Sequence, residues 1–162
     1  MREFDDLYKE YSEGIFKYLI YLTGSKSSAE ELLQETFFQA FKSINRFKGE
    51  SKISTWLYSI ARNVYLKQYS KNKKYNICEL NELSSYINPQ DLLETNYERK
   101  ETLREVLKKI SNLDFDSRQV ILFRVVNELS FKDIGDILGK SENWARVTFH
   151  RVKVRLRKEI EL

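Results

Sequence analysis

Turn-forming and disulfide-forming residues are scarce in this chain of 162 residues, which contains five glycines, one proline and one cysteine. β-Sandwiches and barrels need turn residues every few positions, so the composition disfavours both folds. The single cysteine, Cys78, excludes an internal disulfide framework and a cysteine-rich zinc module. The single histidine, His150, argues against metal binding or triad catalysis by histidine. We therefore expect neither a catalytic site, nor a metal, nor a cofactor.

Long hydrophobic runs are lacking as well. The most apolar stretch near the N-terminus, residues 14–24, contains Lys17 and is too short to span a membrane. Four of the first six residues are charged, so we expect no signal peptide there. Apolar residues nevertheless make up 41% of the chain, which is enough to form a core. The sequence predicts a cytoplasmic protein of one or two small domains.

Charge is divided into zones along the chain, although the net charge is only +4. Residues 1–41 carry a net charge of −4, residues 42–74 carry +8, residues 75–98 carry −5 and residues 99–162 carry +5. Two basic blocks separated by an acidic stretch indicate two surfaces that bind polyanions. Solvated helix faces would produce similar runs of charge, so the motifs inside each block must decide between these explanations.

Apolar residues recur at three- and four-residue intervals, which predicts an all-α chain. The predicted helices cover residues 4–22, 28–44, 54–74, 92–110, 116–127, 130–138 and the segment from 141 onward. The periodicity fails around Pro89, and we interpret residues 75–91 as an acidic linker between two domains, 1–74 and 92–162. The expected N-caps, each with its capping-box partner, are Ser28 with Glu31, Asp116 with Gln119, and Ser130 with Asp133.

Residues 129–151 have the spacing of a helix-turn-helix. Gly139 supplies the tight turn, and the second helix combines an apolar stripe with a basic remainder. Residues 140–158 hold seven bases and one acid. A recognition helix needs this division, because one face packs on the scaffold while the other enters the major groove. A helical hairpin with a basic exposed face is the structural alternative.

The first basic block differs because aromatic residues are interleaved with its charges, Phe47 and Trp56 among them. Aromatic faces in a cationic groove suit the unstacked bases of a single strand. Burial of Trp56 in the core is the alternative. The preceding acidic segment suits a protein partner instead, since Glu31 and Glu35 lie close to Phe38 in the sequence. A nuclease or nucleotidyl transferase would need clustered carboxylates beside the basic block, which contains one acid, Glu50.

Sequence motifs in both predicted domains resemble those of extracytoplasmic-function (group IV) sigma factors of the bacterial sigma-70 superfamily. The segment 28–41, then Phe47-Lys-Gly-Glu-Ser, then Thr55-Trp-Leu-Tyr-Ser-Ile-Ala-Arg-Asn, resemble their promoter-melting sigma-2 domain. Arg118-Gln-Val-Ile-Leu-Phe-Arg and the helix-turn-helix resemble their sigma-4 domain. The resemblance covers nearly the whole chain outside the linker. It implies two small helical domains, a sigma-2 domain at 1–74 and a sigma-4 domain at 92–162.

The resemblance also implies a function and a set of binding residues. The chain is expected to bind core RNA polymerase, direct it to promoters of a stress or envelope regulon, and be held by an anti-sigma factor. The residues that match the helix docking on the clamp helices of the largest polymerase subunits are Glu31, Gln34, Glu35 and Phe38. Those that match positions at the melted −10 element are Phe47, Lys48, Gly49, Ser51, Lys52, Trp56, Arg62, Asn63 and Lys67. Those assigned to the −35 element are Arg124, Lys132, Arg146, Thr148, His150, Arg151 and Arg155.

Two positions depart from the family pattern. Glu31 stands where the family often has Asp, and Val147-Thr148 stands where Ser-Arg is frequent, which removes one cation from the recognition face. The competing interpretation is an autonomous helix-turn-helix regulator, which would bind duplex DNA without polymerase.

Overall fold

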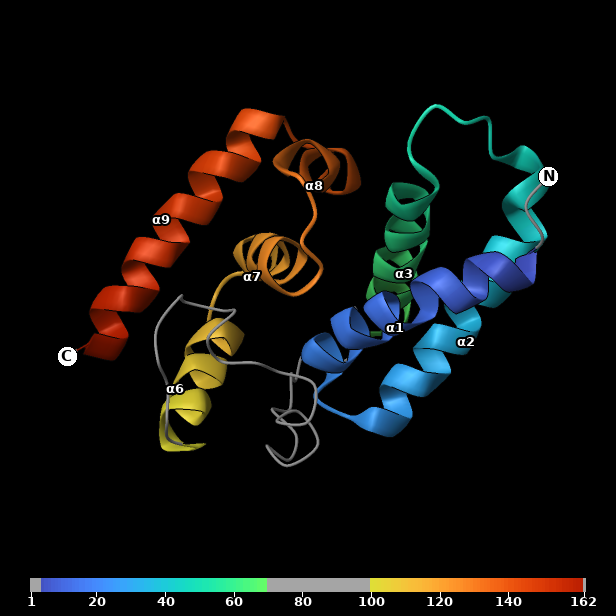
Figure 1. Ribbon diagram of the computed structural model, residues 1–162. Coiled ribbons are helices and arrows are strands. Elements are labelled where there is room, and N and C mark those ends of the chain that lie inside the picture. Colours follow the sequence, from blue (N-terminus) through green and yellow to red (C-terminus); the bar gives the residue numbers. More distant parts are fainter. Residues whose placement is uncertain (1–3, 70–99, 162) are drawn as a thin grey trace. The chain divides into compact units, whose positions relative to one another are not determined.

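The computed structural model describes residues 4–69 and 100–161, and every element within these ranges is helical (Figure 1). This confirms the predicted all-α class. The helices up to Tyr69 belong to one compact unit and those from Lys100 onward to a second. The predicted linker at residues 75–91 lies outside the described residues, and so do residues 70–74 and 92–99 of the two predicted domains.

Within residues 4–69, the first unit has three α-helices and a short 3₁₀ turn. They are α1 (Phe4–Thr23), α2 (Lys26–Ser43), η1 (Ile44–Arg46) and α3 (Ile53–Tyr69). Helices α1 and α2 lie side by side, and α3 packs against both (Figure 1). Their fully buried side chains include Ile15, Tyr18, Leu19, Leu32 and Leu57. Burial of this apolar stripe positions the charged residues of α2 and α3 on the outside of the unit.

The start of α2 differs from the sequence-based prediction. Helix α1 is followed by Gly24 in the left-handed region, at φ 66°, and the extended Ser25 then caps α2. The Ser25 hydroxyl accepts a hydrogen bond from the Ser28 backbone N–H at 3.3 Å. Ser28 is therefore inside the helix, and its predicted capping box with Glu31 is wrong. The earlier serine takes the cap because α1 already ends at Gly24.

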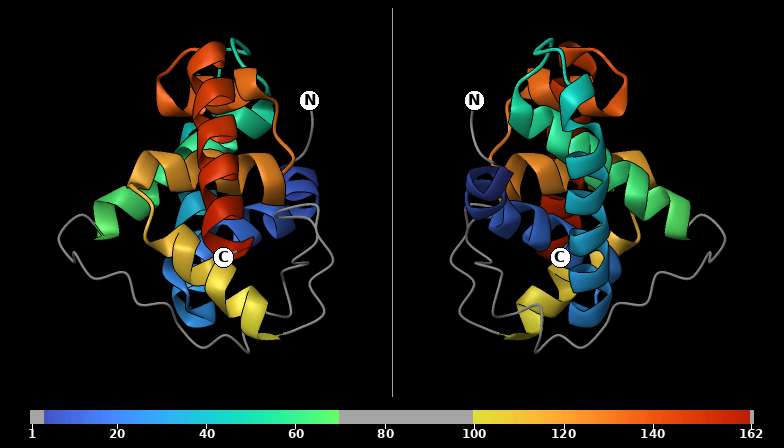
Figure 2. Two further views of the ribbon diagram at one scale, coloured as in Figure 1. Left: turned by 90° about the vertical axis from the view of Figure 1, so that its left-hand side faces the viewer. Right: turned by 90° about the vertical axis from the view of Figure 1, so that its right-hand side faces the viewer.

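The second unit is built around the long C-terminal helix. Its elements are α6 (Lys100–Ser111), α7 (Phe115–Ile121), the π-helical turn η2 (Leu122–Val126), α8 (Phe131–Leu138) and α9 (Glu142–Glu161). Helix α9 packs against α6, α7 and α8, and Figure 2 (left) shows its outer side with α7 and α8 behind it. The buried side chains of α9 are Ala145, Thr148, Phe149, Val152 and Leu156.

Helix α7 begins and ends differently from the prediction. Asp114, not Asp116, is its N-cap, and the Asp114 carboxylate accepts a hydrogen bond from the Ser117 N–H at 3.1 Å. The predicted helix to residue 127 turns π-helical from Leu122, so the α-helical pattern does not continue to its end. Glu128 follows with a φ of 54°, in the left-handed region that L-residues rarely adopt.

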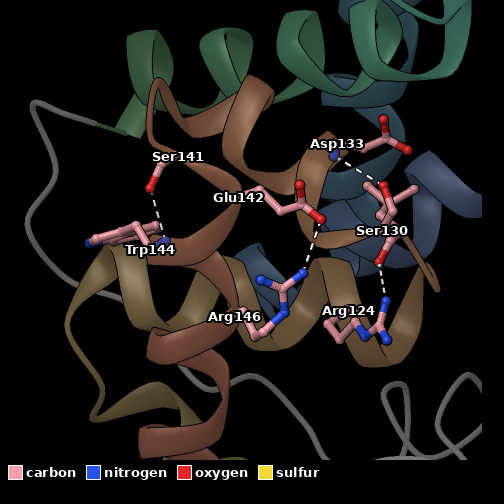
Figure 3. A network of polar contacts seen from close by, with 8 residues as sticks. Arg124, Ser130, Asp133, Ser141, Glu142, Trp144 and Arg146 are labelled. Carbon is pink, nitrogen blue, oxygen red and sulfur yellow. Dashed lines mark hydrogen bonds and ion pairs between the residues drawn. The ribbon is translucent and has the colours of Figure 1, made fainter.

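The helix-turn-helix has the predicted boundaries. The Ser130 hydroxyl accepts the Asp133 N–H at 3.1 Å, and the Ser141 hydroxyl accepts the Trp144 N–H at 3.0 Å (Figure 3). Gly139 ends α8 in the left-handed conformation, at φ 68°. Gly135 permits the close approach of the turn, because a Cβ there would lie 2.7 Å from the Lys140 carbonyl oxygen.

The substitution Gly135→Ala is expected to destabilise the second unit by about 1–3 kcal/mol, because backbone atoms rather than a flexible side chain would have to move. Urea denaturation followed by circular dichroism measures this change. The neighbouring Asp136 is exposed, so Asp136→Ala is the control and should change the free energy of unfolding by less than about 0.5 kcal/mol. A Gly135→Ala variant as stable as this control would contradict the close contact.

The cap at Asp114 predicts a pH-dependent contribution to stability. Burial raises the pKa of this carboxyl, but hydrogen bonds from the Ser117 hydroxyl and N–H outweigh burial and hold the pKa below its usual 3.8. A lowered folded-state pKa stabilises the fold above pH 3.8, and the contribution is lost as the pH falls through the folded-state pKa. Asp114→Ala should therefore cost about 1 kcal/mol at neutral pH and less in acid.

Asp114→Asn keeps a capping oxygen that does not titrate, so it separates the charge from the hydrogen bond. Hydrogen exchange of the α7 amides, measured from about pH 6 to about pH 3, should show the wild type losing protection relative to Asp114→Asn. Parallel loss in both proteins would rule out a contribution from this carboxylate.

Candidate docking and nucleic-acid interfaces

One stripe of α2 carries all four residues assigned to polymerase docking. Glu31, Gln34, Glu35 and Phe38 occupy positions i, i+3, i+4 and i+7, so they share one face, and all four are exposed. Phe38 is 55% exposed, with the Lys42 ammonium 4.6 Å above its ring. An exposed aromatic ring beside two carboxylates is a surface suited to a protein partner rather than to phosphates.

Aromatic residues extend this surface toward the N-terminus of α1. Phe41 is 61% exposed and Tyr8 is 45% exposed. The Phe41 ring packs edge-on against Phe4, with the centroids 5.3 Å apart. Phe37, four positions before Phe41 on α2, is buried and contacts both Phe4 and Tyr8.

A groove of about 730 Å³ runs between α2 and α3. Its lining residues are Glu31, Glu35, Gln39 and Ser43 from α2, and Ile60, Asn63, Val64, Lys67 and Gln68 from α3. The structure thus brings two of the residues assigned to −10 DNA, Asn63 and Lys67, into the same groove as two of the docking carboxylates. This proximity was not evident in the sequence, where more than 25 positions separate the two groups.

The segment between η1 and α3 presents five of the residues assigned to the −10 element, from Phe47 to Lys52. Phe47 packs against Trp56 with ring centroids 5.1 Å apart, and both side chains are half-buried. Trp56 is therefore neither wholly in the core nor wholly exposed. Lys48, Gly49 and Lys52 are exposed and Ser51 is half-buried, with Gly49 at φ 74°.

Helix α3 aligns three of its four assigned residues. Trp56, Asn63 and Lys67 differ by seven and four positions, so they follow one face of the helix, and the latter two are exposed. Arg62 lies about 100° around the helix from Asn63 and is half-buried. The aromatic pair, the exposed amide and the ammonium group can together meet an unpaired base and its phosphate.

The outer side of α9 holds most of the residues assigned to the −35 element. Its exposed residues are Glu142, Asn143, Arg146, Val147, His150, Arg151, Val154, Arg155 and Lys158. The Arg146 guanidinium contacts the Glu142 carboxylate at 3.0 Å (Figure 3). Arg155 contacts Glu159, also at 3.0 Å. Lys132, on α8, is exposed as well.

Thr148 does not lie on this outer side. Its side chain is only 2% exposed, so its placement among the residues that face DNA is wrong. Thr148 is three positions after Ala145 and four before Val152, both of which are buried, and the helical period therefore carries it into the core. Val147 is exposed in its place, at 52%.

The Phe131 ring contacts several polar side chains, and the sequence alone did not predict these contacts. The Arg124 guanidinium lies 4.1 Å from the ring centroid and donates a hydrogen bond to the Leu129 carbonyl at 3.0 Å. Arg146 approaches the same ring at 5.4 Å, and the His150 ring lies 6.3 Å away. Arg124 is half-buried, and its guanidinium contacts groups of its own unit. The sequence-based prediction instead assigned this side chain to DNA.

Within residues 4–69 and 100–161, no group of three His, Cys, Asp or Glu side chains could hold a metal ion. None of the described helices is both long enough and apolar enough to cross a membrane.

Two known sequence families match the two units. Residues 7–75 match Sigma-70 region 2, and residues 103–156 match Sigma-70, region 4. Together they account for most of the chain.

Curated relatives match along almost the whole chain. The RNA polymerase sigma factor YlaC of Bacillus subtilis is 32% identical over 161 residues, covering 96% of this chain and 91% of its own. The extracytoplasmic-function sigma factor SigX of the same organism is 30% identical, covering 98% of this chain and 84% of its own.

Two solved structures share the fold at low sequence identity. CnrH, in complex with the cytosolic domain of CnrY, has a TM-score of 0.74 at 17% identity, covering 98% of this chain and 87% of that one. The sigma factor RpoE of Bartonella quintana, in complex with the anti-sigma factor NepR, has the same TM-score at 20% identity, covering 100% and 99%. The chain belongs to the extracytoplasmic-function group of the sigma-70 family and is an RNA polymerase sigma factor.

Proposed function

We propose that this sigma factor reads the −35 element as duplex DNA through α9 and captures melted −10 bases through the 47–52 loop and α3. The observation that carries the proposal is the division of α9 into a buried, mainly apolar side and an exposed side on which four cations face one acid. A helix so divided is held rigidly by its scaffold while its outer side chains reach base edges and phosphates. We expect the chain to work in the cytoplasm and to have no catalytic activity of its own.

The cations of α9 differ in the contacts that they can make. Arg146 is the fifth residue of the helix, in the part that approaches bases in helix-turn-helix proteins. Its planar guanidinium suits the two acceptors of a guanine. Arg151 and Arg155 lie five and nine residues further along the helix and suit phosphates. Lys132 on α8 would add a phosphate contact at the edge of the groove.

The first unit offers a surface for unpaired bases. The half-buried pair of Phe47 and Trp56 supplies aromatic faces, and the exposed Lys48 and Lys52 supply positive charge. A stacked base contributes about 1–3 kcal/mol, so each captured base stabilises the melted strand relative to the duplex. Asn63 and Lys67 continue this surface along α3. Capture of bases here would shift the promoter from the closed to the open state.

The acidic and aromatic stripe of α2 is proposed to dock on the clamp helices of the largest polymerase subunits. Glu31 and Glu35 would meet a basic surface, and Phe38 would insert between apolar side chains. The second unit would contact the polymerase flap. CnrH and RpoE were solved with CnrY and NepR, so we also propose that an anti-sigma factor holds this chain in its inactive state.

The substitution Glu35→Arg tests the docking surface. A charge reversal at the centre of an acidic interface should weaken association with core polymerase at least about tenfold. Pull-down of core polymerase by the purified chain measures the effect. Glu13→Arg makes the same change of charge at an exposed side chain of α1, and this variant should leave association with polymerase unchanged. Equal binding by both variants would contradict docking through α2.

Two further substitutions separate base reading from phosphate binding. Arg146→Ala should weaken binding to particular −35 sequences by about 1–3 kcal/mol. Lys67→Ala should weaken binding with little sequence preference. It should also lower the slope of the logarithm of the binding constant against the logarithm of salt concentration by about one. Run-off transcription by the holoenzyme on a promoter library, repeated at several salt concentrations, measures both. A uniform loss across all promoters for both variants would refute the assignment of Arg146 to base reading.

A further inference from the structure

Two valines lie on the outer side of α9 among its charged residues. Val147 is 52% exposed and Val154 is 54% exposed. Residues 140–158 otherwise carry seven bases and one acid, so these two valines are apolar side chains on a surface dominated by charge. The buried residues of α9 come from the opposite side of the helix, and neither valine is among them.

The surroundings of Val147 are fixed by contacts within the unit. Arg146, the residue before it, is held by the Glu142 carboxylate at 3.0 Å and lies 5.4 Å from the Phe131 ring. His150, nearly one turn later, has its ring 5.5 Å from that of Phe149. Val147 is therefore an exposed apolar spot bordered by oriented polar side chains.

The thymine C5-methyl is an apolar group displayed on the major-groove edge of a base pair, and it distinguishes thymine from the other bases. A valine side chain can contact this methyl by dispersion and by excluding water, whereas ammonium and guanidinium groups cannot do so without losing hydration. We propose that Val147 is a specificity-determining residue that selects a thymine in the −35 element, next to the base pair contacted by Arg146. This inference rests on the proposed function of α9.

Helix geometry supports the assignment of Val147 over Val154. Val147 is the sixth residue of α9 and follows Arg146 directly, so both lie in the part of the helix that approaches base edges. Val154 is seven residues later, about 10 Å further along the axis, where a recognition helix leaves the bases. The two valines have nearly equal exposure, which makes Val154 a matched control on the same helix.

The test uses the full chain assembled with core polymerase. A promoter library randomised across the −35 element first identifies the preferred sequence of the wild-type holoenzyme. Each thymine of that sequence is then replaced by uracil, which removes the C5-methyl and leaves the base pairing intact. Binding of these duplexes is measured for the wild type, Val147→Ala and Val154→Ala. Alanine is a better helix former than valine, so neither variant should impair the fold.

At one position the wild-type holoenzyme should bind thymine about three- to tenfold more tightly than uracil. Val147→Ala should lose this difference, and Val154→Ala should keep it. The proposal is overturned if the wild type prefers thymine to uracil at no −35 position, or if Val147→Ala retains the preference. It is also overturned if both variants lose the preference equally, since the two valines would then act through a shared protein contact.

Failure of this inference is distinguishable from failure of the proposed function. If the wild-type holoenzyme prefers its selected −35 sequence and Arg146→Ala changes that preference, α9 reads DNA whatever the uracil substitution does. If the wild type binds selected and scrambled −35 sequences equally, the proposed function of α9 fails, and the assignment of Val147 fails with it.

Discussion

The close approach of the turn at Lys140 to Gly135 is the constraint on which the geometry of the second unit depends. The absence of a side chain at Gly135 lets the turn fold back on α8, and Gly139 in the left-handed region then directs the chain into α9. The direction of α9 decides which of its residues are buried. The separation of Thr148 inside from Val147 outside thus depends on a backbone contact in the turn that precedes α9.

Charge zones along the chain are not the same as charge zones in space. The sequence separates an acidic first segment from a basic second one, yet α2 and α3 pack side by side and line one groove. Glu31, Glu35 and Lys67 therefore share a surface. Any partner that occupies this groove meets both signs of charge, so docking of polymerase and capture of the −10 strand are expected to influence each other.

Features with a local cause could be predicted from the sequence, and those set by packing could not. Ser130 and Gly139 were identified because each has a distinct chemical role at a helix end. Ser28 and Asp116 were wrongly chosen as caps because a second residue of the same kind, Ser25 or Asp114, stood upstream. The burial of Thr148 depends on which side of α9 meets α8. The contacts of Phe131 join three elements, and no spacing pattern along the chain encodes them.

The Phe131 ring also links two parts of the unit that have separate tasks. Arg124 comes from the π-helical turn, whereas Arg146 belongs to the helix that faces outward, and both guanidinium groups rest near the same ring. The orientation of Arg146 thus depends on residues remote from the recognition surface. On the proposed reading of DNA by α9, substitution of Arg124 is expected to change promoter preference while every residue of α9 stays the same.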